Sequence, residues 1–220
     1  MIEQEFLSLM DVIDTLLSEQ GCPWDRKQTL LSMRKSLLEE AYEVIEAIDD
    51  GEKSALVDEL GDLLFNGLFL CRLAEKEEKG TLSEALQCIK EKLIRRHPHI
   101  FKTCNDLTSD EVLKQWEEIK KEEYPERQNL FDGISKALPS LLRAQKVLKT
   151  LASKNHPLKM EISEEKVSEE VIGKQFLELT AKAMHSGIDA EQALRGALHS
   201  LEKRALQSQA LHSEEGSLPG

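Results

Sequence analysis

The feature that most constrains the fold of this chain is a helical spacing of apolar residues that persists through almost its whole length. Apolar side chains recur at intervals of three and four, as in Phe6, Leu9, Ile13 and Leu16, and no segment shows the convincing alternation of a half-buried strand. Leu, Glu, Ala and Lys, which favour helices, are abundant, whereas aromatic residues make up only 5% of the chain. We therefore predict an all-α fold.

Turn residues divide this pattern into separate helices. A first helix is expected to end near Gly21, a second at Asp50-Gly51 and a third before Gly80. Thr81 and Glu84 have the spacing of a capping box, which predicts the start of a fourth helix. Four helices of this length joined by short turns predict a helical bundle.

A polar stretch at 122–129 that contains a proline predicts a linker between two halves of the chain. The second half keeps helical spacing, and its last helix is expected to end near Ala205. The tail after it is small and polar, so we expect it to be disordered. The predicted organisation is a helical domain at 1–125, a shortened helical region at 126–206 and a tail at 207–220.

Charge and composition exclude several classes of protein. The net charge of −12 disfavours binding to a nucleic-acid backbone, and an anionic substrate would need a cation or a local basic group beside it. The most apolar stretch, 63–71, is too short for a membrane span of about 20 residues, and the first ten residues do not resemble a signal peptide. The four cysteines form no CxxC pair, which favours reduced thiols in a cytoplasmic protein.

Acidic residues on the second and third helices carry the main chemical signal. Glu40 and Glu43 share one helix face at a spacing of three, and Glu59 and Asp62 repeat that spacing on the next helix. If the two helices pack antiparallel, both pairs point into one cleft, where four carboxylates would repel one another. A hard cation relieves this repulsion, and Mg²⁺ prefers oxygen ligands.

Two alternatives remain open at this point. Helix surfaces are often acidic, so these residues can also be a solvated face. The register is ambiguous as well, because Glu39, Glu43 and Glu46 lie on a neighbouring line of the same helix. Asp62 and Asn66, however, interrupt an otherwise apolar helix, and polar residues in such places usually have a functional or hydrogen-bonding reason.

Four motifs follow in order along the first half of the chain: 21–25 (GCPWD), 37–43 (LLEEAYE), 58–64 (DELGDLL) and 92–101 (KLIRRHPHIF). Together they resemble those of MazG-type nucleoside triphosphate pyrophosphohydrolases, over roughly residues 1–125. Any one of them is weak evidence, but the ordered set is specific. The resemblance implies an all-α MazG-like bundle that binds Mg²⁺ and cleaves nucleoside triphosphates to monophosphate and pyrophosphate.

Residue roles carry over from this family position by position. The resemblance implies that Glu40, Glu43, Glu59 and Asp62 are the metal ligands, with Mn²⁺ as a possible substitute for Mg²⁺. Glu39 would be a base or an outer-shell partner, so Glu39, Glu40 and Glu43 are the expected catalytic residues. The expected substrate is a nucleoside triphosphate and the expected assembly a homodimer; removal of aberrant nucleotides is the implied role, and nucleic acid and membrane are not expected partners.

Further residues are candidates for substrate contacts, each beside a structural alternative. Trp24 can stack on a nucleobase or close the end of the bundle. The basic residues at the end of the fourth helix can bind phosphate, or they can favour the helix C-terminus through its dipole. The predicted substrate-binding residues are Trp24, Lys27, Arg34, Asn66, Arg95, Arg96 and His97.

The second half resembles a degenerate copy of the same domain. Residues 130–146 look like its opening and 187–195 like its close, but the ExxE helix between them is missing. Val171 and Lys174 stand where the family has an ExxD pair, and a lysine does not bind Mg²⁺ as a carboxylate does. We predict no second metal site.

Two other functions stay open on the sequence alone. The acidic face can belong to a non-catalytic helical module that binds a protein partner, or the same chemistry can act on another nucleotide-like pyrophosphate. A rise in melting temperature with Mg²⁺ would distinguish a metal site from an interaction surface.

Overall fold

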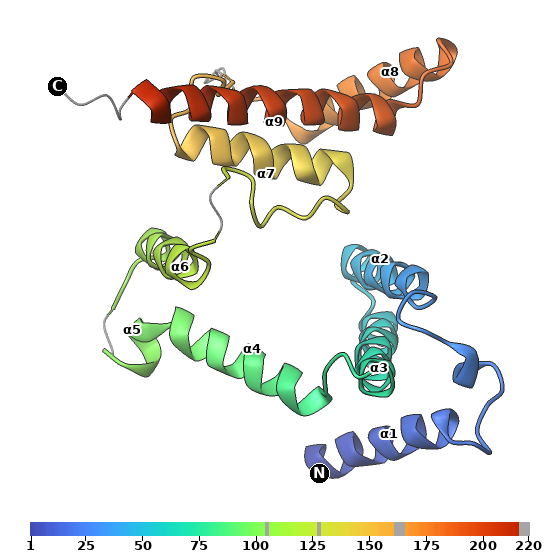
Figure 1. Ribbon diagram of the computed structural model, residues 1–220. Helices are drawn as coiled ribbons and strands as arrows, with labels where there is room; N and C mark the ends of the chain where they lie inside the picture. The colour runs from blue at the N-terminus through green and yellow to red at the C-terminus, as the bar shows by residue number, and fades with distance from the viewer. Residues whose placement is uncertain (104–105, 127–128, 161–165, 216–220) are drawn as a thin grey trace. The chain divides into compact units, whose positions relative to one another are not determined.

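The computed structural model describes residues 1–103, 106–126, 129–160 and 166–215, with side chains described as far as 209. The described residues form helices joined by turns and irregular loops, with no strand among them, which confirms the all-α class (Figure 1). None of the described helices has the length and apolar character needed to cross a membrane. The chain forms two compact units, Met1–Ile119 and Lys120–Gly220, so the division falls slightly before the polar stretch that predicted a linker.

Unit 1 is built mainly from helices whose starts and ends agree with the turn residues. The two-residue link between the second and third helices contains Gly51, which adopts φ +70°, a conformation that costs glycine little. The predicted capping box is formed at Thr81 with Glu84, and a second capping box is formed at Thr108 with Glu111. The elements are α1 (Ile2–Leu17), η1 (Asp25–Lys27), α2 (Arg34–Asp50), α3 (Lys53–Lys76), α4 (Leu82–Arg96), α5 (Pro98–Phe101) and α6 (Ser109–Glu123).

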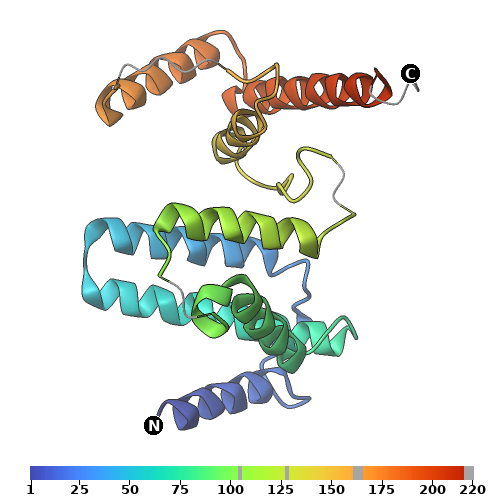
Figure 2. The same ribbon diagram turned by 90° about the vertical axis from the view of Figure 1, so that its left-hand side faces the viewer.

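Helix α3 is the centre of unit 1. It lies antiparallel beside α2 (Figure 2) and also contacts α1 and α4. Its side chains Leu68, Phe69 and Leu73 are buried together with Met10 and Ile13 of α1. Each large apolar side chain buried in this way contributes about 1.5–3 kcal/mol. Among the described residues, α4 packs on α3 but makes no close backbone contact with α2 and diverges from it (Figure 1).

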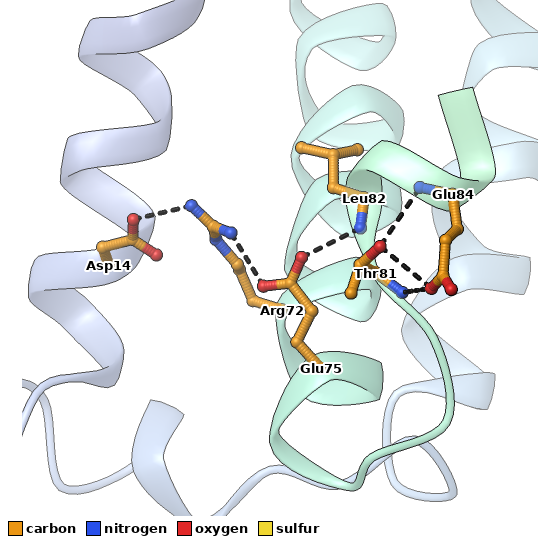
Figure 3. Close-up of polar contacts among 6 residues, drawn as sticks. All are labelled: Asp14, Arg72, Glu75, Thr81, Leu82 and Glu84. Atoms are coloured by element: carbon orange, nitrogen blue, oxygen red, sulfur yellow. Dashed lines mark hydrogen bonds and ion pairs between the residues drawn. The ribbon is translucent and has the colours of Figure 1, made fainter. Parts of the chain in front are cut away.

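A charged network beside this core joins α1, α3 and α4 (Figure 3). The Arg72 guanidinium of α3 donates to Asp14 of α1 at 2.8 Å and to Glu75 at 2.7 Å. The second oxygen of Glu75 accepts the backbone N–H of Leu82, the first residue of α4, at 2.9 Å. Glu75 therefore satisfies a free N–H at the start of α4 and holds that helix against α3.

Unit 2 consists of α7 (Ser140–Ser153), α8 (Glu169–His185) and α9 (Ala190–Glu215). Val147 and Leu151 of α7 are buried against Leu198 and Ala205 of α9. Arg143, only 8% exposed, donates to Glu202 at 2.6 Å across the same pair of helices. Helix α8 contacts α9 alone among the described elements.

The end of the last helix in unit 2 differs from the sequence prediction. Helix α7 begins at Ser140, directly after Pro139, which cannot donate a helical hydrogen bond. Helix α9 continues to Glu215, so the tail predicted to be disordered from 207 is helical as far as that residue. No Gly or Pro occurs in 206–215 to stop the helix, and 216–220 lie outside the described residues.

We expect Glu75→Gln to lower the free energy of unfolding by about 1–2 kcal/mol at pH 7, since it weakens two hydrogen bonds to a charged acceptor. The Leu82 N–H and then Arg72 hold the pKa of Glu75 below its ordinary value. A lowered pKa stabilises the fold above the ordinary value of the carboxyl, and this contribution is lost as pH falls through the folded-state pKa. Denaturant unfolding at pH 7 and pH 3 should therefore show a difference that shrinks in acid.

The matched control is Glu78→Gln, an exposed glutamate three residues along the chain. It should change stability little at either pH. If Glu75→Gln lost as much stability at pH 3 as at pH 7, the contribution of Glu75 could not come from the charge of its carboxylate.

Candidate metal centre on α2 and α3

Three of the predicted carboxylates come together between α2 and α3. One oxygen from each of Glu40, Glu43 and Glu59 lies within 4.8 Å of the others. Glu40 and Glu59 are half-buried and Glu43 is exposed, so the group opens to solvent on one side. Sequence spacing within each helix predicted the two rows, and the short turn at Gly51 brings the rows face to face.

Asp62 completes the set from the next turn of α3. Burial raises the pKa of Glu40, and the charges of Asp62 and Glu43 raise it further. Burial also raises the pKa of Glu59, followed by the charge of Glu43. Across the two helices, the charge of Asp62 therefore acts on Glu40 and the charge of Glu43 acts on Glu59.

A neutral pair lies one helical turn beyond the carboxylates. Ser36 Oγ of α2 donates to Asn66 Oδ1 of α3 at 3.0 Å, and Asn66 Nδ2 donates to the carbonyl oxygen of Asp62 at 3.1 Å. Asn66, predicted as a substrate contact, is only 2% exposed. Ser36 was not singled out from the sequence, although its position four residues before Glu40 on the same helix is a signal that could have found it.

The donor set fits a hard divalent cation. All of its atoms are carboxylate oxygens, and the described residues place no lysine or arginine in an ion pair with Glu40, Glu43, Glu59 or Asp62. Their mutual repulsion is thus uncompensated by protein cations. Mg²⁺ takes such oxygen ligands and keeps several waters, which suits a site open on one side.

Glu39 and Arg34, also on α2, do not join this group. Glu39 is exposed and pairs with Lys35 at 3.0 Å. Arg34 is the first residue of α2, and at 100° per residue it lies on roughly the opposite side of the helix from Glu43. The register that the sequence left open thus has Glu40, rather than Glu39, facing α3.

Two of the basic residues at the end of α4 contact groups close to that helix end. Arg96 is 9% exposed, and its guanidinium lies 5.0 Å from the ring centre of Trp116 on α6. His97 packs its ring against the same tryptophan at 5.1 Å, and its Nδ1 lies 2.7 Å from the Leu93 carbonyl oxygen. Arg95 precedes them at the same end of α4, which is directed away from α2 and α3 (Figure 1). The structure does not bring these three residues to the carboxylates.

Trp24 and Lys27 lie in the loop before α2. Trp24 is 66% exposed, so it does not close the bundle end as the structural alternative required. Lys27 lines a cleft of about 410 Å³ together with Arg26 and Lys76. Lys76 follows Asp62 by 14 residues on α3, which corresponds to about 20 Å along the helix. The cleft that Lys27 lines is therefore distant from the carboxylates along α3. Contact between Lys27 and a substrate at the carboxylates stays a prediction.

Comparison with known proteins identifies the family of the region that carries the carboxylates. The family described as the MazG nucleotide pyrophosphohydrolase domain matches residues 28–101, a range that contains the whole carboxylate group. A mazG-related protein from Thermotoga maritima of known crystal structure is 30% identical; the match covers 52% of this chain and 97% of that one, with a TM-score of 0.47. This chain belongs to the MazG family.

Two curated relatives extend the comparison. The nucleoside triphosphate pyrophosphohydrolase of Escherichia coli K12 is 40% identical over 154 residues, which is 66% of this chain and 59% of that protein. The uncharacterized protein YabN of Bacillus subtilis 168 is 38% identical over 150 residues, or 68% of this chain and 31% of that protein. This MazG chain therefore spans less than two thirds of the length of these relatives.

We expect Glu40→Gln to raise the melting temperature by about 2 °C at pH 7 in the presence of a chelator, because it removes one of four repelling charges. Because the pKa of Glu40 is raised in the folded protein, its ionised carboxylate destabilises the fold and its protonated form does not. The rise in melting temperature should therefore disappear as pH falls below the ordinary pKa of the carboxyl. Thermal unfolding of both proteins at pH 7 and pH 4 measures this.

Glu39→Gln makes the same change one residue away, on a side chain outside the group. It should not stabilise the protein. Equal stabilisation by the two variants would mean that the general negative charge, and not the facing pairs, is responsible.

Proposed function

We propose that this MazG chain is a divalent-cation-dependent nucleoside triphosphate pyrophosphohydrolase. The observation that carries the proposal is the convergence of Glu40, Glu43 and Glu59 without a basic partner, on the two helices that the family match contains. The name of the Escherichia coli relative, a nucleoside triphosphate pyrophosphohydrolase, supports the choice of substrate and products.

In this proposal Glu40, Glu43, Glu59 and Asp62 hold Mg²⁺, with Mn²⁺ as a substitute. A bound cation supplies neutralisation of phosphate charge and activation of a water molecule. The carboxylates orient the cation, and an open groove of about 550 Å³ along α3, lined by Asp58, Gly61 and Asp62, offers room for the substrate beside it. Water adds across the α–β phosphoanhydride, one P–O bond breaks, and monophosphate and pyrophosphate leave.

The reaction gives a direct test of this proposal. With Mg²⁺ the full chain should release pyrophosphate from a nucleoside triphosphate, and EDTA should abolish the release. Glu40→Ala, Glu43→Ala, Glu59→Ala and Asp62→Ala should each reduce kcat/KM by about 100-fold or more, since each removes a cation ligand. Glu46→Ala, on α2 outside the group, should have a mild effect.

Product analysis also separates the alternatives. Orthophosphate and nucleoside diphosphate as the first products would contradict cleavage at the α–β linkage. Absence of turnover with every triphosphate tested, together with no effect of Mg²⁺ on melting temperature, would favour the non-catalytic interaction module. Turnover only of another nucleotide-like pyrophosphate would keep the chemistry and change the substrate.

We also propose that unit 2 is a degenerate copy without a metal site. Lys174, at the predicted carboxylate position, is exposed and forms an i, i+4 pair with Glu178. The described part of unit 2 contains no group of three acidic, histidine or cysteine side chains close enough to share a cation. Residues 129–220 expressed alone should therefore bind no Mn²⁺ in a calorimetric titration and hydrolyse nothing, whereas 1–128 should retain turnover. Turnover confined to 129–220 would overturn the assignment.

A homodimer and a role in clearing aberrant nucleotides in the cytoplasm complete the proposal. The dimer is supported by large apolar side chains that α2 and α4 leave exposed, such as Tyr42, Ile45 and Ile89. Exposed apolar rows of this kind are commonly covered by a partner surface. The biological role rests on the family resemblance.

A further inference from the structure

The neutral pair Ser36–Asn66 has a fixed relation to the carboxylates. Along α2, Ser36, Glu40 and Glu43 follow at spacings of four and three; along α3, Asn66, Asp62 and Glu59 follow at the same spacings in the opposite direction. Because the helices are antiparallel, the two rows form three facing pairs. The only pair joined by a direct hydrogen bond between neutral side chains is Ser36 with Asn66.

The two charged pairs do not hold the helices in this register. In the register that the Ser36–Asn66 hydrogen bond marks, the equal spacing sets Glu40 opposite Asp62 and Glu43 opposite Glu59, and like charges placed in this way repel one another before a cation binds. A slide of α3 by one turn, about 5.4 Å, would put Asn66 opposite Glu40 and would leave Ser36 without its partner. Repulsion between the carboxylates favours such a displacement or a separation of the helices.

The neutral pair opposes that movement. Asn66 is 2% exposed, so loss of its hydrogen bond to Ser36 leaves a buried amide oxygen without a donor. The amide nitrogen is bonded to the Asp62 carbonyl, which fixes the orientation of the side chain toward α2. Asn66 therefore connects the main chain at a carboxylate residue of α3 to a hydroxyl on α2.

We propose that Ser36 and Asn66 are positioning residues whose hydrogen bond sets the register of α2 against α3 at which the carboxylates converge on one cation. They act through Glu40 and Asp62 and do not contact the cation or the substrate. The inference rests on the proposed cation site, and it replaces the substrate contact that the sequence suggested for Asn66.

The test is the affinity of the metal-free full chain for Mn²⁺, measured by titration calorimetry without nucleotide. Ser36→Ala and Asn66→Leu should each raise the Kd by about tenfold, the effect typical of partners that orient metal ligands. Ser36→Thr keeps the hydroxyl and should stay within about twofold of the wild type, and the double variant should be no weaker than the more affected single variant.

Ser140→Ala is the matched control, because the Ser140 hydroxyl likewise donates across a pair of helices, to Glu191 at 2.8 Å, and is at least as well shielded from water, with Ser140 only 1% exposed. It should lower stability and leave the Kd for Mn²⁺ unchanged. Circular dichroism and the melting temperature of each variant show that the protein is folded during the titration; Ser36→Ala, the smallest change, keeps the test valid if Asn66→Leu does not fold.

The outcomes separate this inference from the proposed function. Wild-type affinity in Ser36→Ala and Asn66→Leu, or an equal loss in Ser140→Ala, would overturn the positioning role while leaving the cation site intact. A wild-type chain that binds no Mn²⁺ would overturn the cation site itself. A tenfold loss in Ser36→Ala that Ser36→Thr restores would support the inference, because a purely structural loss would not track the hydroxyl.

Discussion

The turn at Gly51 joins α2 to α3 within two residues, and this short link requires the two helices to run antiparallel. Every feature of the candidate site depends on that arrangement. Two rows of side chains that are spaced alike on separate helices become facing pairs, and an ordinary acidic surface becomes a converging group of oxygens. The apolar face of α3 packs against α1 and holds the pair of helices in the core of unit 1.

Convergence of like charges has a cost that the fold does not relieve with its own cations. The chain has 41 acidic and 29 basic residues, and the described basic side chains near α2 and α3 pair elsewhere or lie on other faces. A divalent cation offsets the repulsion at the point where it is greatest. A strongly acidic protein also needs such a cation to bind a negatively charged triphosphate. One bound cation would therefore both stabilise the fold and favour substrate binding.

Local signals in the sequence predicted much of this structure. Gly51 and the Thr81–Glu84 capping box determine helix ends through local backbone geometry. They could therefore be recognised in the sequence without knowledge of the tertiary structure. The spacing of Glu40, Glu43, Glu59 and Asp62 was visible because the helical period determines which residues share a face. The number of helices predicted a helical bundle, but not which helices pack together, since the path of α4 depends on contacts between helices that no local pattern encodes.

Residues whose role depends on a distant partner could not be assigned in the same way. For His97 and Arg96 the sequence suggested phosphate binding, which stays a prediction, but their contacts with Trp116, about 20 residues later, could not be read from a local pattern. Asn66 was recognised as unusual, yet its partner Ser36 is an inconspicuous serine 30 residues earlier. The helical extension of α9 was missed because small polar residues suit both a tail and a helix, and only the absence of Gly and Pro before 216 separates the two.

The central claim is that α2 and α3 hold a divalent cation between their facing carboxylates. Anomalous scattering from crystals of the full chain grown with Mn²⁺ tests it most directly, since the metal position is read without reference to activity. The account predicts an anomalous peak within coordination distance, about 2.0–2.3 Å, of oxygens from Glu40, Glu43 and Glu59. A peak elsewhere on the chain, or none between these helices at Mn²⁺ concentrations that support turnover, would contradict it.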